Sequence, residues 1–571
     1  MKIDCDHRYL LFPVSTHAQK KSLRFHREGQ LLLDLDLSLD NVTPDYEVAV
    51  DIGRFGPGEM VLSCIPEMEV HARPSDDPGW QAGLYKERFR PRFHFSTKRG
   101  WINDPNGLVY YRGNYHLFYQ YNPVGCAWGN MHWGHAVSPD LLHWEEWETA
   151  LFPDEGGTMF SGSAIVDTEN TLGLNTADQE AILLFYTAAG NTSLLSKDKP
   201  STQNLAYSID GGRTFHKHAR NPIVPQIAEG NRDPKIIRSP VKGHWVMALF
   251  LTGMRYALLS STNLLDWVVI QELDLPDDSE CPDFFPLTIR GGCTEGAPIP
   301  NASENTACPD ATGQAFPATK IVSAAHAKSS SPVAPQEFWV LCGAADRYQV
   351  GTFDGHRFIP DGSVKRLHYG SHSYAAQSWS NIPASDGRRI RIAWNTFDIP
   401  GMPFNKCMTL PCEMSLRTLA GERMLCAWPI REVETLHRNA RTEINLAATS
   451  ESPFVMPLAA CAHDIHLRIR KQDAESFTLS LFGLDIVCNM LNRRLECLDK
   501  TAPFEPNDDG FMALRLIMDT TGAELFLNEG SVYLSNGFPA DWNLNRLEIR
   551  PCSGSMEVEI LTVAELPDIW A

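Results

Sequence analysis

The sequence predicts an all-β protein in which a β-propeller of four-stranded blades precedes a C-terminal β-sandwich. Helical periodicity is scarce, whereas short apolar and aromatic runs bounded by Gly, Asn, Asp and Pro recur along the chain. A turn pattern that begins with Ser and continues with Asp or Asn two residues later also recurs. Its copies lie at 138–144, 208–215 and 261–267, with a further candidate at 351–355. These intervals suit propeller blades with loops of variable length. The alternative is repeated turn chemistry without a structural repeat, because Ser, Asp and Gly dominate turns in any fold.

Residues 1–88 are predicted to form a small β-rich appendage, because apolar and polar residues alternate at 30–37 and 46–52. Pro74, Pro78 and Gly79 mark its exit.

Residues 89–425 are predicted to hold the propeller. Its first hairpin is expected at 107–119 around a Gly-Asn turn, and similar strand-like runs follow at 181–186, 244–251, 338–343 and 389–394. The segment 291–335, rich in Ala, Ser, Thr, Pro and Gly, is predicted to be a loop insertion.

Residues 440–571 are predicted to form the β-sandwich, since strand-like runs of another style return at 466–470, 477–482 and 514–518.

Composition and charge narrow the classes of partner. The chain has 571 residues with 43% hydrophobic and 21% charged residues, which is typical of a globular protein. A net charge of −20 repels phosphate backbones and anionic lipids, so neither nucleic acid nor membrane is an expected partner. No signal peptide or membrane-spanning run is recognised, and a cytoplasmic location is expected. The 14 cysteines lack zinc-ligand spacing and are interpreted mostly as reduced, buried thiols.

Three acidic residues, far apart in the sequence, stand out because each lies next to or near a proline at a strand or loop boundary. Asp104 lies in the segment 101–107, Trp-Ile-Asn-Asp-Pro-Asn-Gly, Asp233 precedes Pro234, and Glu280 opens Glu-Cys-Pro-Asp at 280–283. Radially arranged blades can aim several such acids into one central funnel. Taken alone, Asp104 is as compatible with an ordinary turn, and for Asp233 and Glu280 a surface turn or an ion pair is the favoured interpretation.

Aromatic, amide and hydroxyl side chains near the first acid suit a sugar, which offers a weakly apolar ring face and a rim of hydroxyl groups. Gln120, Trp128 and the segment 160–164, Phe-Ser-Gly-Ser-Ala, supply them. Trp133 and Trp144 are instead interpreted as core residues.

Four of these motifs occur in the order found in glycoside hydrolase family 32, the family of invertases, inulinases and levanases, which this chain therefore resembles. They are Trp-Ile-Asn-Asp-Pro-Asn-Gly, Phe-Ser-Gly-Ser-Ala, Arg-Asp-Pro-Lys and Glu-Cys-Pro-Asp. The likeness extends over 93–416 and returns at 518–530. It implies a five-bladed β-propeller catalytic domain joined to a β-sandwich, and retaining hydrolysis of β-fructofuranosidic bonds.

By position in the motifs, the resemblance implies that Asp104 is the nucleophile, Glu280 the general acid/base and Asp233 the transition-state stabiliser. A retaining glycosidase needs two carboxyls about 5 Å apart, one ionised to attack and one protonated to assist the leaving oxygen. Asp104 is accordingly expected to keep a low pKa. The residues that resemble the family's fructose pocket are Asn103, Gln120, Trp128, Phe160, Ser161, Arg232, Tyr374 and Trp394.

The sequence departs from the family pattern at two positions. His368 stands where many members carry an acidic residue that helps to bind the glucose of sucrose, and Cys412 stands where arginine is common. The first change argues against a preference for sucrose over fructan oligomers.

The sequence thus predicts an exo-acting β-fructofuranosidase that needs neither cofactor nor metal and whose partner is a small-molecule or oligosaccharide substrate with β-fructofuranosyl units. Three alternatives stay open. A fructosyltransferase uses the same covalent intermediate, a non-catalytic sugar-binding propeller uses the same fold, and an inverting pentosidase would hold its carboxyls roughly 6.5 to 9.5 Å apart.

Overall fold

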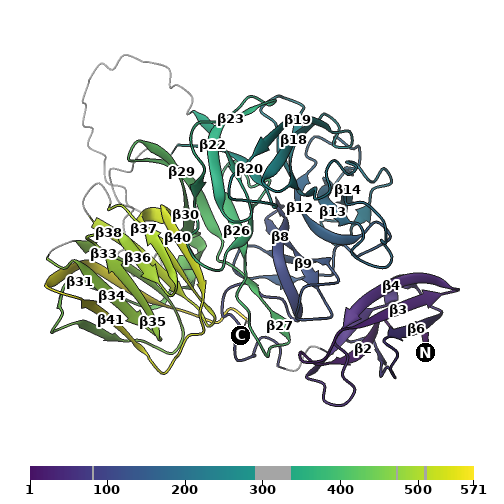
Figure 1. The fold of residues 1–571 in the computed structure, drawn as a ribbon, viewed down its shortest axis with the longest axis horizontal. Helices are drawn as coiled ribbons and strands as arrows, with labels where there is room; N and C mark the ends of the chain where they lie inside the picture. Colours follow the sequence, from purple (N-terminus) through teal and green to yellow (C-terminus); the bar gives the residue numbers. More distant parts are fainter. Residues whose placement is uncertain (80–82, 290–335, 471–472, 507–510, 571) are drawn as a thin grey trace, which may run out of the picture.

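The computed structural model describes residues 1–79, 83–289, 336–470, 473–506 and 511–570. Strands dominate these ranges, whose helices are three short 3-10 turns: η1 (Gly53–Phe55), η2 (Arg431–Leu436) and η3 (Asn528–Gly530). The prediction of an all-β protein is confirmed. Figure 1 shows that the N-terminal strands (purple) and the C-terminal strands (yellow-green) lie on different sides of a central body.

The N-terminal appendage consists of two small antiparallel sheets packed around their own apolar core. Its β3–β4 hairpin turns through Glu28 and Gly29, both with positive φ, as a two-residue hairpin loop requires. The sheets run in the orders β1-β6-β3-β4 and β5-β2-β7. Their strands are β1 (Lys2–Asp4), β2 (Tyr9–Val14), β3 (Lys21–Arg27), β4 (Gln30–Leu37), β5 (Tyr46–Asp51), β6 (Glu59–Ile65) and β7 (Arg73–Ser75).

The central body contains five antiparallel sheets of four main strands each, which are the blades of the propeller. The first three blades are β8 (Gly100–Tyr111), β9 (Asn114–Asn122), β10 (His132–Ser138) and β11 (Glu145–Glu146); β12 (Thr158–Val166), β13 (Ile182–Ala189), β14 (Thr202–Ser208) and β15 (His216–Lys217); and β16 (Arg232–Arg238), β17 (Trp245–Thr252), β18 (Arg255–Ser261) and β19 (Val268–Asp274).

The fourth and fifth blades complete the propeller and carry short additional strands. The fourth is β20 (Asp283–Thr288), β21 (Glu337–Cys342), β22 (Arg347–Phe353) and β23 (Phe358–Pro360), with β24 (Lys365–Arg366) beside β22. The fifth is β25 (Tyr374–Ser378), β26 (Arg389–Asn395), β29 (Cys412–Leu419) and β30 (Glu422–Pro429), with β28 (Cys407–Met408) beside β26. A further strand, β27 (Phe404–Asn405), pairs in parallel with β8.

The innermost strands of the five blades form a closed ring. Each contacts the next in the order β8, β12, β16, β20 and β25, and β25 returns to β8. The closure is held by backbone hydrogen bonds, because Tyr110 N donates to Ser380 O and Ser380 N donates to Leu108 O, both over 2.9 Å. The predicted five-bladed propeller is therefore present.

The repeated turn of the sequence marks the same place in successive blades, directly after the third strand. Asp140 and Asp210 each accept from the hydroxyl of a preceding serine and from backbone N–H groups, and Asn263 does the same in the third blade. The candidate fourth copy is equivalent, because Asp354 follows β22 and accepts from His356 N and Arg357 N. The structural repeat, rather than turn chemistry alone, explains the pattern.

The C-terminal strands form two six-stranded antiparallel sheets with an apolar core between them, which confirms the predicted β-sandwich. One sheet holds β31 (Arg438–Thr449), β42 (Ser555–Leu566), β33 (Ala462–Arg470), β38 (Phe511–Met518), β39 (Gly522–Leu527) and β40 (Val532–Gly537). The other holds β32 (Phe454–Pro457), β41 (Arg546–Pro551), β34 (Ser476–Leu481), β35 (Leu484–Asn489), β36 (Arg494–Cys497) and β37 (Lys500–Pro503).

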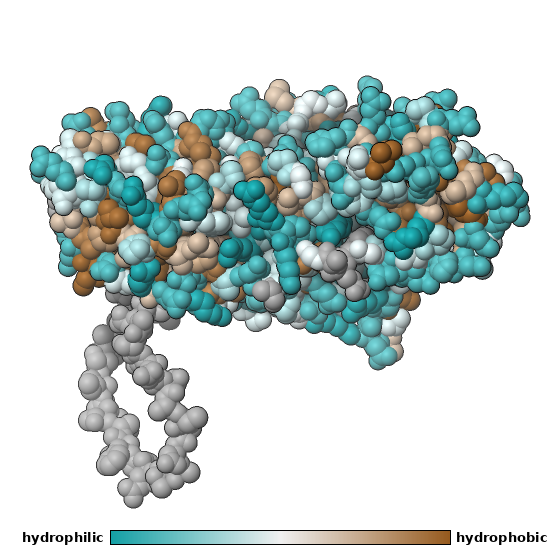
Figure 2. All heavy atoms as spheres, turned by 90° about the horizontal axis from the view of Figure 1, so that it is seen from below, coloured by the Kyte–Doolittle hydropathy of each residue, from teal (hydrophilic) through white to brown (hydrophobic). Residues whose placement is uncertain are grey.

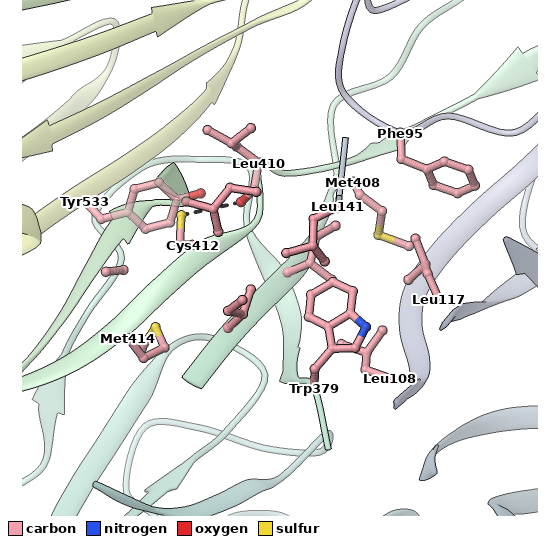
Figure 3. Packing of buried hydrophobic residues seen from close by; sticks show 14 of the residues in the cluster. Phe95, Leu108, Leu117, Leu141, Trp379, Met408, Leu410, Cys412, Met414 and Tyr533 are labelled. Atoms are coloured by element: carbon pink, nitrogen blue, oxygen red, sulfur yellow. Dashed lines mark hydrogen bonds between the residues drawn. The ribbon is translucent and has the colours of Figure 1, made fainter. Parts of the chain in front are cut away.

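Propeller and sandwich share one continuous apolar core. Tyr533 of β40 and Phe526 of β39 belong to the same cluster as Met414 and Leu425 of the fifth blade. Figure 3 shows Tyr533 beside Cys412 and Leu410, with the cluster continuing toward Trp379 and Phe95 in the propeller.

A buried ionic joint lies at the same boundary. His94 places Nδ1 2.7 Å from Oδ2 of Asp519 and Nε2 3.0 Å from Oε1 of Glu524. Asp519 also accepts from Arg92 N, and Glu524 from Leu410 N. Burial alone would lower the pKa of His94, but its two carboxylate partners raise it to about 9, so the ring is charged at neutral pH and donates from both nitrogens.

Outside these cores the surface is mixed. Figure 2 shows hydrophobic residues in small groups among hydrophilic ones on the face seen from below. No helix in the described ranges is long and apolar enough to cross a membrane. The described cysteines are unpaired and most are buried, as interpreted from the sequence. The domain bounds 1–88, 89–425 and 440–571 stay predictions, and the predicted insertion 291–335 lies outside the described residues.

Candidate active site

The three predicted acids come from three different blades and stand at the beginning of inner strands. Asp104 belongs to β8, Asp233 is the second residue of β16, and Glu280 lies just before β20. The ring of inner strands therefore brings together residues that are far apart in the sequence.

Cys281 joins two of the acids directly. Its Sγ lies 3.5 Å from Oδ2 of Asp104 and 3.5 Å from Oδ2 of Asp233, so its one S–H group can donate a hydrogen bond to either carboxylate. Its backbone N–H donates to the same oxygen of Asp233 over 3.0 Å. Asp104 and Asp233 consequently face the same space.

Asp104 is buried, with 9% of its surface exposed, and is surrounded by hydrogen-bond donors. Ser161 Oγ donates to its Oδ2 over 2.6 Å, Asn103 Nδ2 to its Oδ1 over 3.2 Å, and Gln120 Nε2 to its Oδ2 over 3.4 Å. Burial nevertheless raises the pKa of Asp104, and the charge of Glu280 adds to the rise, although the Ser161 and Asn103 donors oppose it. The expectation of a low pKa for Asp104 is therefore wrong in direction, because desolvation outweighs the donors.

Asp233 is buried more deeply, with 2% of its surface exposed. Burial raises its pKa to about 7; the guanidinium of Arg232 opposes this rise, while the charges of Glu280 and Asp104 add to it. Arg232 Nε lies 3.6 Å from Oδ2 of Asp233. Burial and the neighbouring negative charges therefore both disfavour the ionised form of Asp233.

Glu280 is the most accessible of the three acids, with 26% of its side chain exposed. Arg232 donates to its Oε2 from Nε over 3.2 Å and from a terminal nitrogen over 2.7 Å. The hydroxyl of Tyr374 donates to its other oxygen, Oε1. Both carboxyl oxygens are thus held in a defined orientation toward the pocket.

The backbone of the site adopts conformations that side chains rarely take. Asp233, Glu280 and Cys281 have φ values of 65°, 46° and 41°, in the left-handed region that costs non-glycine residues free energy. Fixed hydrogen bonds hold these conformations in place. Asp233 N donates to Thr187 Oγ1 over 2.9 Å, and the Tyr256 hydroxyl donates to Glu280 O over 3.2 Å.

The structure places five of the eight predicted substrate-binding residues in contact with these acids. Asn103, Gln120 and Ser161 contact Asp104, and Arg232 and Tyr374 contact Glu280. The other three are aromatic. Phe160 precedes Ser161 in β12, the ring of Trp128 lies 6.1 Å from that of Phe160, and the ring of Trp394 lies 6.3 Å from that of Tyr374.

Sequence reasoning missed several groups that shape the site. Cys281 lay within a motif that had been singled out, but its contact with two acids depends on folding. Thr187, Tyr256 and Lys406 carried no signal in the sequence. Lys406 Nζ lies 5.0 Å from the ring of Trp101 and 5.9 Å from that of Trp394, beside the aromatic side of the pocket.

One expectation about the pocket needs correction. His368 is buried at the boundary with the sandwich, where its Nε2 accepts from Ser535 N over 2.9 Å and its ring lies 5.1 Å from that of Tyr533. Burial lowers its pKa to about 4, so it is neutral there. His368 contributes to the interface between propeller and sandwich. Its identity therefore does not indicate whether sucrose or fructan is preferred.

Within the described ranges, no cluster of three or more His, Cys, Asp or Glu side chains is arranged to hold a metal ion. The expectation of catalysis without metal or cofactor stays a prediction.

Relatives of known activity place these residues in context. Residues 94–429 match the model of the glycosyl hydrolases family 32 N-terminal domain. A levanase of Bacillus subtilis (strain 168) is 32% identical over 527 residues, which cover 86% of this chain and 72% of the levanase. An extracellular exo-inulinase of Aspergillus awamori is 28% identical over 516 residues, covering 79% of this chain and 89% of the inulinase.

Solved structures share the fold. The crystal structure of the exo-inulinase from Aspergillus awamori matches with a TM-score of 0.70 at 23% identity, over 85% of this chain and 100% of that chain. The β-fructofuranosidase from Schwanniomyces occidentalis complexed with fructosyl-erythritol matches with a TM-score of 0.68 at 23% identity, over 84% of this chain and 98% of that chain. The family model spans more than half of the chain, and the chain therefore belongs to glycoside hydrolase family 32 and is a glycoside hydrolase.

Proposed function

We propose that this glycoside hydrolase is a retaining, exo-acting β-fructofuranosidase that removes the terminal fructosyl unit of sucrose, fructo-oligosaccharides or fructans. The observation that carries the proposal is the convergence of Asp104, Asp233 and Glu280, from three blades, in one cluster with hydrogen-bond donors that suit a sugar. The relatives named levanase and exo-inulinase, and the related fold that binds fructosyl-erythritol, support the choice of fructosyl substrates.

In the first step, a carboxylate oxygen of Asp104 attacks the anomeric carbon while Glu280 gives its proton to the glycosidic oxygen. The glycosidic bond breaks, the leaving group departs with that proton, and fructose stays bound to Asp104 as an ester. In the second step Glu280 takes a proton from water, the resulting hydroxide attacks the same carbon, and Asp104 is released.

Asp233 has a different task in this scheme. The transition state carries positive charge on the anomeric carbon and ring oxygen, and a fixed carboxylate beside it stabilises that charge electrostatically. Thr187 and Cys281 anchor Asp233 through its backbone N–H and its side chain respectively. Arg232 reaches both Glu280 and Asp233 and offsets part of the negative charge that three neighbouring acids create.

Burial supports the exo mode. Asp104 and Asp233 expose 9% and 2% of their surfaces, so the reacting sugar must enter deeply to reach them. A terminal unit can do so, whereas a unit inside a polymer would need a groove open at both ends.

Replacement of the nucleophile tests the proposal. Asp104→Asn should lower kcat for fructose release from sucrose and from kestose by about 10³-fold or more, with an unchanged unfolding transition. Asp4→Asn, an exposed aspartate of the appendage, is the matched control and should keep full activity. Fructose release by the purified Asp104→Asn protein at the parental rate would show that another group attacks the sugar.

Product analysis tests stereochemistry and acceptor choice together. With methanol added, a retaining enzyme should form methyl β-fructofuranoside, whereas formation of the α-anomer would refute retention. At high sucrose concentration, free fructose as the main product supports hydrolysis, and elongated oligosaccharides would identify a fructosyltransferase instead.

A further inference from the structure

The N-terminal appendage docks on the propeller at the loop that carries Trp128. This loop, residues 123–131, connects β9 to β10 in the first blade. Lys20 Nζ, from the appendage, donates to the carbonyl oxygen of Trp128 over 3.1 Å. Tyr46 places its hydroxyl 2.9 Å from the sulfur of Cys126 in the same loop. The appendage lies outside the matched family model, which begins at residue 94.

The docking follows from the pattern of β4. Alternate residues Leu33, Leu35 and Leu37 face the appendage core, so the side chains of Asp34 and Asp36 point away from it. Asp34 Oδ2 accepts from Leu194 N in the second blade over 2.9 Å. The one strand thus contacts loops of two adjacent blades.

Asn130 covers the free edge of the appendage sheet. β4 is an edge strand, whose outward backbone groups lack a partner strand. Asp36 N donates to Asn130 Oδ1, and Asn130 Nδ2 donates to Asp36 O, both over 2.9 Å. The amide of Asn130 therefore makes the pair of bonds that a neighbouring strand would make.

The propeller holds the other side of the loop. Asn122 Nδ2 donates to Ala127 O over 2.8 Å, and Asn405 Nδ2 donates to Cys126 O over 3.0 Å. Trp128 remains 51% exposed, and its ring packs edge to face with that of Phe160, the residue before Ser161. Because Ser161 follows Phe160 and donates to Asp104, we place the half-exposed Trp128 ring on the outer rim of the site that holds the acids.

We propose that the N-terminal appendage is a specificity element of the active site: through Lys20 and Asn130 it fixes Trp128 on the rim, and thereby increases affinity for fructan chains whose further units pass over that rim. This inference rests on the proposed function, because it assumes that fructosyl chains enter the pocket. A half-exposed indole offers its face to a sugar ring only in a fixed orientation, and preset orientation spares the entropy of ordering the loop on binding. Sucrose, which ends close to the acids, gains less from the rim than longer chains do.

The test compares Lys20→Ala with Lys20→Arg and with Lys2→Ala. Lys2 is the matched control, because it forms an exposed ion pair with Glu59 within the appendage, away from the loop. Lys20→Ala removes one hydrogen bond and should raise KM for kestose and inulin by about 5- to 10-fold, with kcat within about twofold of the parent. The rise for sucrose should be smaller. Lys20→Arg keeps a donor and should restore most of the affinity.

A double-mutant cycle separates positioning from general destabilisation. If Lys20 acts through Trp128, Lys20→Ala should have no further effect on KM in a Trp128→Ala background. Additive effects of the two changes, an unchanged KM for inulin in Lys20→Ala, or an equal loss on sucrose and inulin would each overturn the proposal.

Binding to an inactive enzyme keeps this test apart from that of the proposed function. Calorimetric titration of Asp104→Asn with kestose should show affinity that falls on adding Lys20→Ala, whether or not Asp104 is the nucleophile. If the parental enzyme releases fructose from no substrate, the proposed function fails. If it releases fructose but the Lys20 variants bind inulin normally, only the role of the appendage fails.

Discussion

The propeller holds its two neighbours in opposite ways. The sandwich shares a continuous apolar core with the last blade and clamps the charged His94 between two buried carboxylates. The appendage has a core of its own, to which the propeller adds Val124, and docks mainly through hydrogen bonds at accessible positions. The first interface is built for permanence. The interface with the appendage orders the loop 123–131 through a few hydrogen bonds and adds little to the free energy of unfolding. Such an interface suits a domain that adjusts specificity.

The largest effect should come from breaking the ionic joint. His94→Leu leaves Asp519 and Glu524 buried without their cation, and should lower the free energy of unfolding by about 3–5 kcal/mol. Urea unfolding followed by fluorescence measures it. His143→Leu, which removes an exposed histidine paired with Asp140, is the control and should cost under about 1 kcal/mol. Equal, small losses in both variants would contradict the contrast between the interfaces.

Alkaline pH should weaken the same joint without mutation. The pKa of His94 is raised from 6.5 to about 9 in the folded protein. The contribution of its charge to the free energy of unfolding is therefore complete below pH 6.5 and is lost as pH rises through 9. The loss between these limits amounts to about 3 kcal/mol. Urea midpoints measured from pH 6 to 10 should fall in the parent and stay flatter in His94→Leu. Parallel curves for the two proteins would refute a charged His94.

A smaller effect is expected at the appendage. Glycine can adopt the φ of 49° found at Asn130, but Asn130→Gly removes both hydrogen bonds to Asp36. The free energy of unfolding should therefore fall by about 1 kcal/mol. Amide hydrogen exchange should quicken at Asp36 and leave the amides of β17 unchanged. Faster exchange in both places would mean that the appendage supports the propeller core, and the proposed contrast would not hold.

The smallest effect should follow Arg8→Ala. Arg8 pairs with Asp51 in the appendage and with Glu148 in the propeller at solvent-exposed positions. Such pairs contribute at most about 1 kcal/mol and weaken with salt. The unfolding midpoint should therefore change little at low salt and not at all in 0.5 M NaCl. A loss comparable to that of His94→Leu would place the appendage among the permanent interfaces.

Local patterns made much of this molecule predictable. Turn residues such as Asp140 and Asp210 recur because each blade needs the same tight connection. Asp104 is marked by the run Asp-Pro-Asn-Gly, but Asn106 and Gly107 lie inside β8 beside a register shift and form no turn, so the expected turn there is wrong. Interactions between distant segments left no such mark. Thr187 supports Asp233, and His368 turns toward the sandwich, only because the chain brings together strands far apart in sequence. The left-handed backbone at Glu280 and Cys281 likewise depends on contacts with distant segments, and no glycine at these positions indicates it in the sequence.

Closure of the strand ring has a consequence for how activity arises. Donors to the acids come from the first inner strand, β8, and from Tyr374 on the last inner strand, β25. A nascent chain therefore cannot assemble the site until about two thirds of the chain has been synthesised. Activity therefore requires the complete ring of five blades. A truncated chain that ends before the last blade should be inactive even if its earlier blades are folded.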